Sequence, residues 1–390
     1  MMTKPMTDRD RFLATMHYQS RDRVPLCDFG FWDETIVFWH EQGLPTWVTG
    51  GHDTRQTSVF FGMDSFGGGP WVNLGLFPTF ESKVIEDRGD HELAQQPDGV
   101  IVLRKKFMGS IPEHHGHLLT DRASWEQHYK PRLNPDTPGR EIDWTEAGKI
   151  WSDPDCPFPK MNFGGSLFGC LRDWMGMENI SYLVYDDPGL FAEMVQTLGD
   201  LYVEVHRRAF AHGARWDVCL MWEDMCYNNG PLLPPALFQK YLVPQYRRIT
   251  SQLRQHGCDI TLVDCDGKID DLIPLWLGAG VNCMFPIEIG TWGADPVKYR
   301  KQYGKDLLLM GGFDKHILAK TPRDIEREVH RLTPLVEEGG FIPFCDHRVP
   351  PDVSLANYLF YLETARKVWG KGVNLKPLGK LERAPVAKRP

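Results

Sequence analysis

The sequence predicts an α/β fold and, within that class, a (β/α)8 TIM barrel. From about residue 158 onward, short apolar runs alternate with amphipathic stretches, as where "WDVCLMWED" precedes "PPALFQKYLVPQYRRITSQLRQHG". That alternation indicates parallel strands joined by helices. The sequence has no Gly-x-Gly-x-x-Gly turn after an early strand, which argues against a dinucleotide-binding sheet. Polar residues also follow successive apolar runs, and in a barrel such strand ends open on one face.

The first 43 residues carry signals for two helices and a strand. Thr7, with Asp10 three residues later, predicts a capping box for a helix over "DRFLATMHY". The apolar run from Val24 to Phe29 predicts a short strand, and residues 33–43 look helical.

Residues 81–118 break the alternation and predict a β-hairpin excursion. "ESKVIEDR" and "GVIVLRKKF" favour strands, and Pro97-Asp98-Gly99 between them is a turn sequence. The histidine-rich "HHGH" at 114–117 has the composition of a metal site, but its place in the excursion makes it the weaker candidate. Helix is expected to resume at "DRASWEQHYKPRL".

Composition bounds the domain organisation. We expect one barrel domain over residues 1–370 and a disordered tail over 371–390. That tail holds six basic residues, one acidic residue and three prolines. The 390 residues could also form two smaller domains, and length alone does not decide between these.

Charge and cysteine content exclude some classes of protein. The chain has 44 basic and 52 acidic residues, so it lacks the basic excess of a nucleic-acid-binding protein. No apolar run reaches membrane-spanning length, and no signal-peptide pattern opens the chain. Nine cysteines without CxxC pairing indicate reduced thiols in a cytoplasmic protein.

Acidic side chains recur where the predicted strands end. One such residue is explained equally well as the N-cap of the next helix. Several in the same position are harder to explain by capping alone, so we expect them to share one face of the barrel. They are Glu223 with Asp224, Asp264 with Asp266, Glu288, Asp314, and Asp346 with His347.

The stretch "LVDCDGKID" at 262–270 places two aspartates around one cysteine. Side chains alternate along a strand, so Asp264 and Asp266 would face the barrel mouth and Cys265 the helices. The alternative is an Asp-Gly turn in which Asp266 caps a helix from Ile269.

Carboxylates this close repel each other unless something positive lies between them. A divalent metal, a basic substrate or a shared proton would serve. For a metal, we expect Asp264, Asp266 and His347 as ligands, helped by Glu223. Zinc, manganese, iron and magnesium all suit such a site. The expected catalytic residues are Glu223 and Asp224, and the expected substrate contacts are Trp32, Trp222, Tyr227 and Arg348.

Long blocks of the chain resemble proteins of the uroporphyrinogen decarboxylase superfamily, in order and up to about residue 369. That superfamily has a (β/α)8 barrel fold, which agrees with the prediction above. The blocks are "TDRDRFLATMHYQSRDRVPL", "WEDMCYNNGPLLPPALFQKYLVPQYRRI", "FPIEIGTWGADPVKYRKQYG", "LLLMGGFDKHILAKTP" and "DHRVPPDVSLANYLFYLETA".

The resemblance implies one of two activities, cofactor-free decarboxylation of a porphyrinogen or methyl transfer involving a corrinoid. True decarboxylases carry an RQAGRY block whose arginines hold substrate carboxylates, but this chain has "CDFGFWDETIVF" there. Zinc methyltransferases carry an H-x-C-G pattern and a later cysteine. Here the pattern aligns with Asp264-Cys265-Asp266-Gly267 and the later cysteine with His347, so the chain resembles the O-demethylase-like branch more closely.

The leading hypothesis is therefore a metal-dependent methyltransferase, with zinc the first choice of metal. It would move a methyl group from a small methylated compound, such as a methoxy-aromatic one, to a corrinoid on a partner protein. One alternative is decarboxylation of a porphyrinogen or a smaller acid. Another is a non-catalytic barrel that binds a tetrapyrrole, a corrinoid or a protein. No nucleic acid or membrane partner is expected, and the oligomeric state stays open, a homodimer included.

Overall fold

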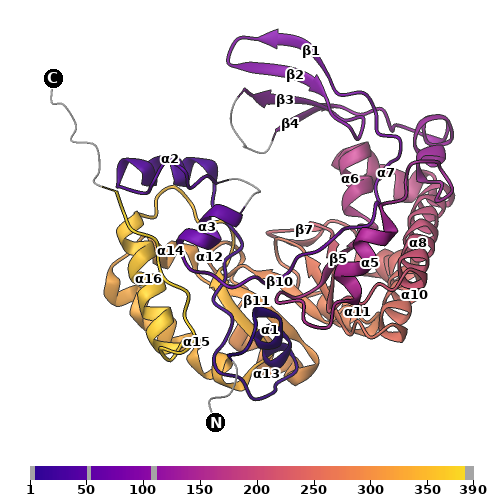
Figure 1. Ribbon diagram of the computed structural model, residues 1–390. Coiled ribbons are helices and arrows are strands. Elements are labelled where there is room, and N and C mark those ends of the chain that lie inside the picture. Colours follow the sequence, from indigo (N-terminus) through magenta and orange to yellow (C-terminus); the bar gives the residue numbers. More distant parts are fainter. Residues whose placement is uncertain (1–4, 51–53, 107–111, 383–390) are drawn as a thin grey trace. The chain divides into compact units, whose positions relative to one another are not determined.

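A computed structural model describes residues 5–50, 54–106 and 112–382 of the chain (Figure 1). These residues form two compact units. Unit 1 comprises Met1–Gly67, Pro157–Pro159 and Met284–Pro390, and unit 2 comprises Gly68–Cys156 and Lys160–Cys283. Unit 1 therefore brings together the two ends of the sequence. A single barrel domain over residues 1–370 stays a prediction.

The C-terminal part of unit 1 is built from parallel strands that alternate with helices. Strands β11 and β12 pair in parallel, with Leu309 opposite Phe341, and every residue of both is buried. Helix α15 packs on β11, β12 and α16. The elements are β10 (Cys283–Ile287), α12 (Ile289–Trp292), α13 (Pro296–Tyr303), the 3-10 turn η4 (Gly304–Asp306), β11 (Leu308–Phe313), α14 (Lys315–Leu318), α15 (Pro322–Glu338), β12 (Phe341–Cys345) and α16 (Leu355–Val368).

The N-terminal part of unit 1 holds α1 (Asp8–Met16), α2 (Asp33–Glu41) and α3 (Arg55–Phe60). The capping box predicted from Thr7 and Asp10 is present.

The strand predicted over Val24 to Phe29 is wrong as a ladder strand. The segment joins no strand ladder; the Asp64 N–H donates to the Leu26 carbonyl at 2.8 Å, and the Leu26 N–H donates to Oδ2 of Asp64 at 2.9 Å. Pro25 gives one reason, because proline has no N–H to donate to a ladder.

Residues 371–382, the part of the predicted tail that the structure describes, contact unit 1, and a disordered tail over 371–390 stays a prediction. The Arg23 guanidinium donates to the carbonyls of Val373 and Asn374, and the Lys376 ammonium lies 2.7 Å from Asp8. Further along, the Gly379 N–H donates to the Phe60 carbonyl at 2.6 Å. The tail thus runs as an extended strap over unit 1. Residues 383–390 lie outside the described part of the chain.

Unit 2 contains three parallel strands in the order β5-β6-β9. Helices α8 and α10 lie side by side along one edge of the unit (Figure 1). The elements that follow residue 143 are α5 (Trp144–Ser152), β5 (Met161–Gly165), α6 (Gly169–Met175), α7 (Met177–Asp186), α8 (Pro188–Ala211), β6 (Val218–Trp222), β7 (Cys226–Tyr227), β8 (Gly230–Pro231), α9 (Pro235–Leu237), the π-turn η3 (Phe238–Leu242), α10 (Val243–Gln255), β9 (Ile260–Asp264) and α11 (Ile273–Gly278).

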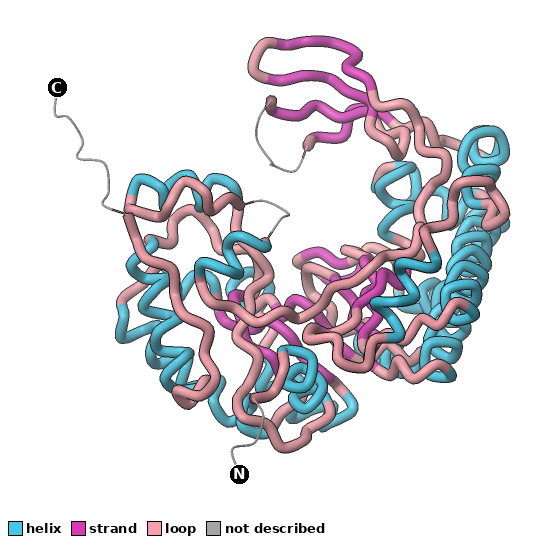
Figure 2. Tube along the Cα trace, viewed as in Figure 1, coloured by secondary structure: helices cyan, strands magenta, loops and turns pink. Residues whose placement is uncertain are grey.

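The predicted β-excursion is confirmed as a four-stranded antiparallel sheet in the order β1-β2-β3-β4 (Figure 2). Its turn residue Gly99 has a φ of +87°, which favours glycine. Residues 107–111 of the predicted region lie outside the described residues. The elements are β1 (Lys83–Arg88), β2 (His91–Gln95), β3 (Ile101–Lys105) and β4 (Glu113–Gly116), followed by α4 (Arg122–Ser124), the π-turn η1 (Trp125–Tyr129) and the 3-10 turn η2 (Lys130–Leu133).

The amphipathic stretch "PPALFQKYLVPQYRRITSQLRQHG" is helical, but it is not one regular α-helix. A π-turn occupies Phe238–Leu242, and Pro244 then lies in the first turn of α10. Proline is tolerated there because first-turn N–H groups have no intrahelical acceptor. None of the helices formed by the described residues is both long enough and apolar enough to cross a membrane.

Candidate metal centre

Two neighbouring parallel strands of unit 2 end at the predicted site. Strand β6 ends at Trp222, which lies opposite Asp264, the last residue of β9. The pairing continues one residue further, because the Glu223 N–H donates to the Asp264 carbonyl at 2.9 Å. The acidic residues that follow the two strands are therefore neighbours in space as well.

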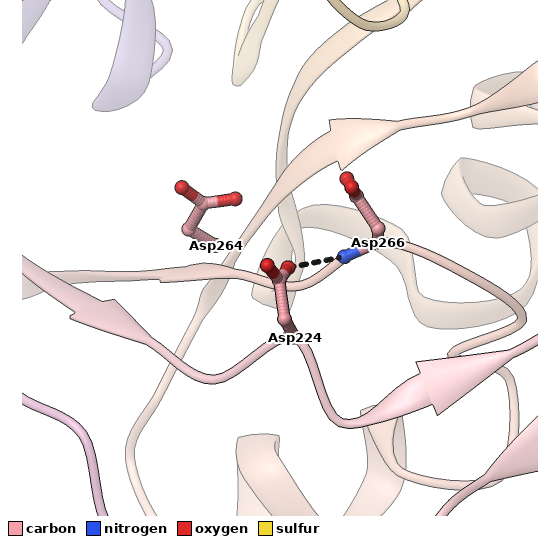
Figure 3. A group of neighbouring side chains, drawn as sticks. All are labelled: Asp224, Asp264 and Asp266. Atoms are coloured by element: carbon pink, nitrogen blue, oxygen red, sulfur yellow. Dashed lines mark hydrogen bonds between the residues drawn. The ribbon is translucent and has the colours of Figure 1, made fainter. Parts of the chain in front are cut away.

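Three aspartates gather at these strand ends (Figure 3). In the described part of the chain, the group whose side chains could together hold a metal ion is Asp224, Asp264 and Asp266. One carboxylate oxygen from each lies within 4.8 Å of the others. The Asp266 N–H donates to Oδ1 of Asp224 at 3.2 Å. The structure thus brings together the two aspartates that strand alternation placed on one face, and adds Asp224.

The backbone around the group is unusual at two positions. Asp224 has a φ of +40°, a left-handed conformation that aspartate tolerates better than most residues. Gly267 has a φ of +94°, and a Cβ there would lie 2.6 Å from the Cys226 carbonyl oxygen. Only glycine lets the loop after Asp266 approach Cys226 this closely. The next residue, Lys268, donates its N–H to the Tyr227 carbonyl at 3.0 Å.

Cys265 is buried, and its thiol is not among the side chains of the candidate metal group. Its Sγ accepts the Met225 N–H at 3.3 Å, and burial raises the pKa of the thiol well above its usual value. Such a thiol is a poor nucleophile, because the thiolate is the reactive form. The alternative in which Asp266 caps a helix does not hold, since α11 begins at Ile273 after Leu272 in the N-cap position.

Electrostatics at the group favour a cation. Burial, and then the negative charge of Asp266, raise the pKa of Asp224 to about 6. The positive charge of Arg172 acts in the opposite direction. Arg172 lies on α6, donates to the Asp224 carbonyl oxygen, and places its guanidinium 5.4 Å from the centre of the Trp222 ring. A divalent ion bound between the carboxylates would favour their charged forms.

Glu223 is placed differently from the sequence prediction. Its Oε1 accepts from the Leu167 N–H at 2.9 Å and from the Tyr246 hydroxyl at 2.6 Å. Its Oε2 accepts from the N–H groups of Phe168 and Gly169, at 2.8 and 3.0 Å. The side chain is fully buried, and burial raises its pKa. These contacts direct the carboxylate of Glu223 toward the start of α6, and its expected metal-binding and acid roles stay predictions.

The other predicted site residues of the β6 end are Trp222 and Tyr227. Trp222 contacts Arg172 as described. Tyr227 lies in the short β7–β8 hairpin and exposes 62% of its surface, so it has room to contact a ligand. The histidines of "HHGH" form a ring pair, His114 with His117 at 5.4 Å, outside the aspartate group.

Three predicted residues, Trp32, His347 and Arg348, lie together in unit 1. The His347 ring lies 5.7 Å from the Trp32 ring and 5.4 Å from Phe29. The Arg348 guanidinium lies 5.4 Å from the Trp32 ring and 5.6 Å from Phe29. The role of His347 as a metal ligand stays a prediction, as do the substrate contacts of Trp32 and Arg348.

The remaining strand-end acids in unit 1 have protein partners. Asp346 accepts from the N–H groups of Gly290 and Lys315, at 2.7 and 2.9 Å. Glu288 accepts from the Lys315 ammonium at 2.8 Å. Asp314 accepts from the His316 N–H and caps α14, so helix capping accounts for this residue.

Sequence reasoning missed Asp28, a buried carboxyl in unit 1. It accepts the Tyr358 hydroxyl at 2.8 Å, and burial raises its pKa to about 7. Its only sequence signal is an acid inside the apolar run "VPLCDF". The partner tyrosine lies 330 positions away, and no local pattern links two residues at that separation.

Two curated relatives are similar in sequence to part of this chain. The uroporphyrinogen decarboxylase of Syntrophotalea carbinolica is 26% identical over 54% of this chain and 60% of its own length. The uroporphyrinogen decarboxylase of Nostoc is 21% identical over 48% of this chain and 51% of its own length. The matched region thus spans only half to three fifths of these relatives.

The fold is similar to that of a methyltransferase from Methanosarcina mazei. The two chains superpose with a TM-score of 0.56 at 14% sequence identity, over 93% of this chain and 99% of the other. The sequence model described as uroporphyrinogen decarboxylase (URO-D) matches residues 162–368, more than half of the chain. The chain therefore belongs to the uroporphyrinogen decarboxylase family.

Proposed function

We propose that the protein is a metal-dependent methyltransferase. It takes a methyl group from a small methylated compound, with methoxy-aromatic compounds as the first class to test, and passes it to a corrinoid on a partner protein. The observation that carries the proposal is the oxygen cluster of Asp224, Asp264 and Asp266 at the ends of β6 and β9. The fold it shares with a methyltransferase supports the same class of reaction.

The donor set fits a divalent cation. Three carboxylates offer hard oxygen ligands, which suit magnesium, manganese, iron and zinc. Zinc remains the first expectation from the resemblance, and oxygen ligands extend the choice to the harder ions. When bound, the ion would supply Lewis-acid polarisation of the methoxy oxygen.

The residues of unit 2 have separable tasks in this proposal. Asp264 and Asp266 hold the cation, with Asp224 as the third ligand. A carboxylate engaged this way is ionised and cannot also protonate the leaving alkoxide. We therefore assign Asp224 to the metal rather than to acid catalysis, and the proton for the alkoxide comes from water. Tyr227 and Trp222 lie within three residues of Asp224 in the sequence. We assign them to contacts with the substrate.

Metal content tests the proposal directly. The protein is purified anaerobically and compared with an Asp264→Asn/Asp266→Asn variant. We expect about one divalent ion per wild-type chain and its loss from the variant. A methoxy-aromatic compound such as vanillate, mixed with the protein and cob(I)alamin, should yield methylated cobalamin only with wild-type protein. Wild-type protein that takes up no divalent ion would contradict the proposal.

A second candidate is decarboxylation of a porphyrinogen or smaller acid, favoured by the names of both curated relatives. In that case Asp264 or Asp266 would stabilise a cationic pyrrole intermediate. This function predicts carbon dioxide release that chelators do not affect. Chelator-sensitive methyl transfer without such release would exclude it.

A further inference from the structure

Glu223 lies next to the aspartate cluster in sequence, but its side chain serves another element. Its carboxylate accepts the N–H groups of Leu167, Phe168 and Gly169, the residues that open α6. Hydroxyl groups of Tyr246 and Ser166 complete the shell, at 2.6 and 3.4 Å. A buried carboxylate surrounded by donors fixes its neighbours firmly, because charged hydrogen bonds are about twice as strong as neutral ones.

The same residue contacts the metal-bearing strand through its main chain. The Glu223 N–H donates to the Asp264 carbonyl at 2.9 Å. The contact with α6 is close as well, since a Cβ on Gly169 would lie 2.6 Å from the Glu223 carbonyl oxygen. Glu223 therefore joins β6, β9 and the first turn of α6 at one point.

Helix α6 in turn contacts Asp224. Arg172, three residues after Gly169, donates to the Asp224 carbonyl oxygen and lies over the Trp222 ring. Asp224 adopts a left-handed φ of +40°, which persists only when the surrounding structure enforces it. The enforcing contacts are Glu223 before it, Arg172 on its carbonyl, and the Asp266 N–H on its side chain.

We propose that Glu223 is a positioning residue for the metal cluster. It anchors the start of α6, so that Arg172 holds the backbone of Asp224 and the Asp224 carboxylate stays beside Asp264 and Asp266. This inference rests on the proposed function only in that the cluster binds a divalent ion. A purely structural helix cap would lower stability and leave the metal properties of the folded protein unchanged.

Manganese binding measures the difference. Mn²⁺ is titrated into wild-type protein, Glu223→Gln and Tyr246→Phe, and followed by electron paramagnetic resonance. Glu223→Gln replaces one acceptor oxygen with a donor, so it faces the N–H groups of Phe168 and Gly169 or of Leu167 with the wrong polarity. We expect its Kd for Mn²⁺ to rise roughly 10- to 100-fold, as for loss of outer-shell partners, with an altered spectrum. Tyr246→Phe should shift Kd in the same direction by less.

Glu193→Gln is the matched control. Glu193 is also a many-donor glutamate of unit 2, bonded to Arg122, Trp125 and Lys130. The Glu193→Gln substitution should leave the Kd for Mn²⁺ and the resonance spectrum at wild-type values. Circular dichroism at the titration temperature confirms that each variant is folded.

The outcomes separate the two proposals. Wild-type protein that binds no Mn²⁺, Mg²⁺ or Zn²⁺ overturns the metal cluster and the inference with it. Wild-type binding with an unchanged Kd and spectrum in folded Glu223→Gln overturns the inference alone. Where Glu223→Gln fails to fold, Tyr246→Phe decides: a weaker Kd and shifted spectrum support positioning, and wild-type values overturn it.

Discussion

The strand ends of unit 1 and unit 2 both carry acidic residues, but the groups that surround these residues differ. In unit 1, Asp346 accepts from two backbone N–H groups, Glu288 pairs with Lys315, and Asp314 caps α14. In unit 2, Asp224 and Asp264 gather with Asp266 within 4.8 Å. The first set is satisfied mainly by protein donors, and the second brings carboxylates against one another.

That difference separates structural acids from a candidate site. Hydrogen bonds from a lysine or from N–H groups offset part of the cost of burying a carboxylate. Carboxylates clustered together raise the free energy of the folded chain unless a cation or proton intervenes. Position after a strand is therefore not evidence of function, whereas the close approach of three carboxylates is a reason to test for a bound cation. Substitutions in unit 2 should therefore change metal binding, whereas substitutions in unit 1 should change stability and leave metal binding unaltered.

The largest expected effect is on metal binding in unit 2. Asp264→Asn/Asp266→Asn should weaken Mn²⁺ binding beyond the roughly 100-fold that outer-shell losses cost. Without metal, its free energy of unfolding should equal or exceed that of wild-type protein, because mutual repulsion is removed. Calorimetric titration and urea unfolding measure the two quantities. A marked loss of stability without metal would place these aspartates with the structural acids of unit 1.

Lys315→Met tests the ion pair in unit 1. It leaves Glu288, of which 4% is exposed, without its ammonium partner. Breaking a buried pair in this way costs about 3–5 kcal/mol, so we expect a loss of that order in urea unfolding.

The double variant Lys315→Met/Glu288→Gln is the control and should recover much of the loss. Mn²⁺ affinity should stay at the wild-type value in both variants. Weakened Mn²⁺ binding would show that the separation between the two regions is incomplete.

The pH dependence of stability should reveal Asp346. Burial raises its pKa to about 6 from the usual 3.8. Because the folded-state pKa is the higher one, Asp346 destabilises the fold increasingly as pH rises from about 4 to 6, and by a constant amount above that. Between pH 4.5 and 7.5, wild-type protein should therefore lose roughly 2 kcal/mol of unfolding free energy relative to Asp346→Asn. Urea unfolding at both pH values measures it, and a pH-independent difference would contradict the raised pKa.

The smallest effect should come from the cap residue Asp314. Asp314→Ala removes the bond to the His316 N–H and should cost about 1 kcal/mol of unfolding free energy. Asp314→Asn keeps a capping oxygen and should cost less. Thermal unfolding resolves the pair, and any change in Mn²⁺ affinity would argue that Asp314 belongs to a binding site.

Much of the fold could be predicted from sequence patterns. The α/β barrel class of the uroporphyrinogen decarboxylase type is confirmed by the family match and by the shared fold. The β-excursion and the capping box of α1 were predictable because turn residues and cap spacings act over a few residues. The path of residues 371–382 over unit 1 was not predictable, because the residues that bind this segment, Arg23 and Asp8, lie more than 340 positions away in the sequence.

The candidate site also contains features that local sequence patterns predict and features that depend on distant residues. The closeness of Asp264 and Asp266 at the end of β9 could be predicted from their spacing, because side-chain alternation along a strand is a local rule. The approach of Asp224 to these two residues, and the contact of Glu223 with α6, depend on tertiary packing. That packing depends on which donors the neighbouring elements present: three N–H groups at the start of α6 take the carboxylate of Glu223, and the left-handed backbone at the next residue directs Asp224 to the cluster.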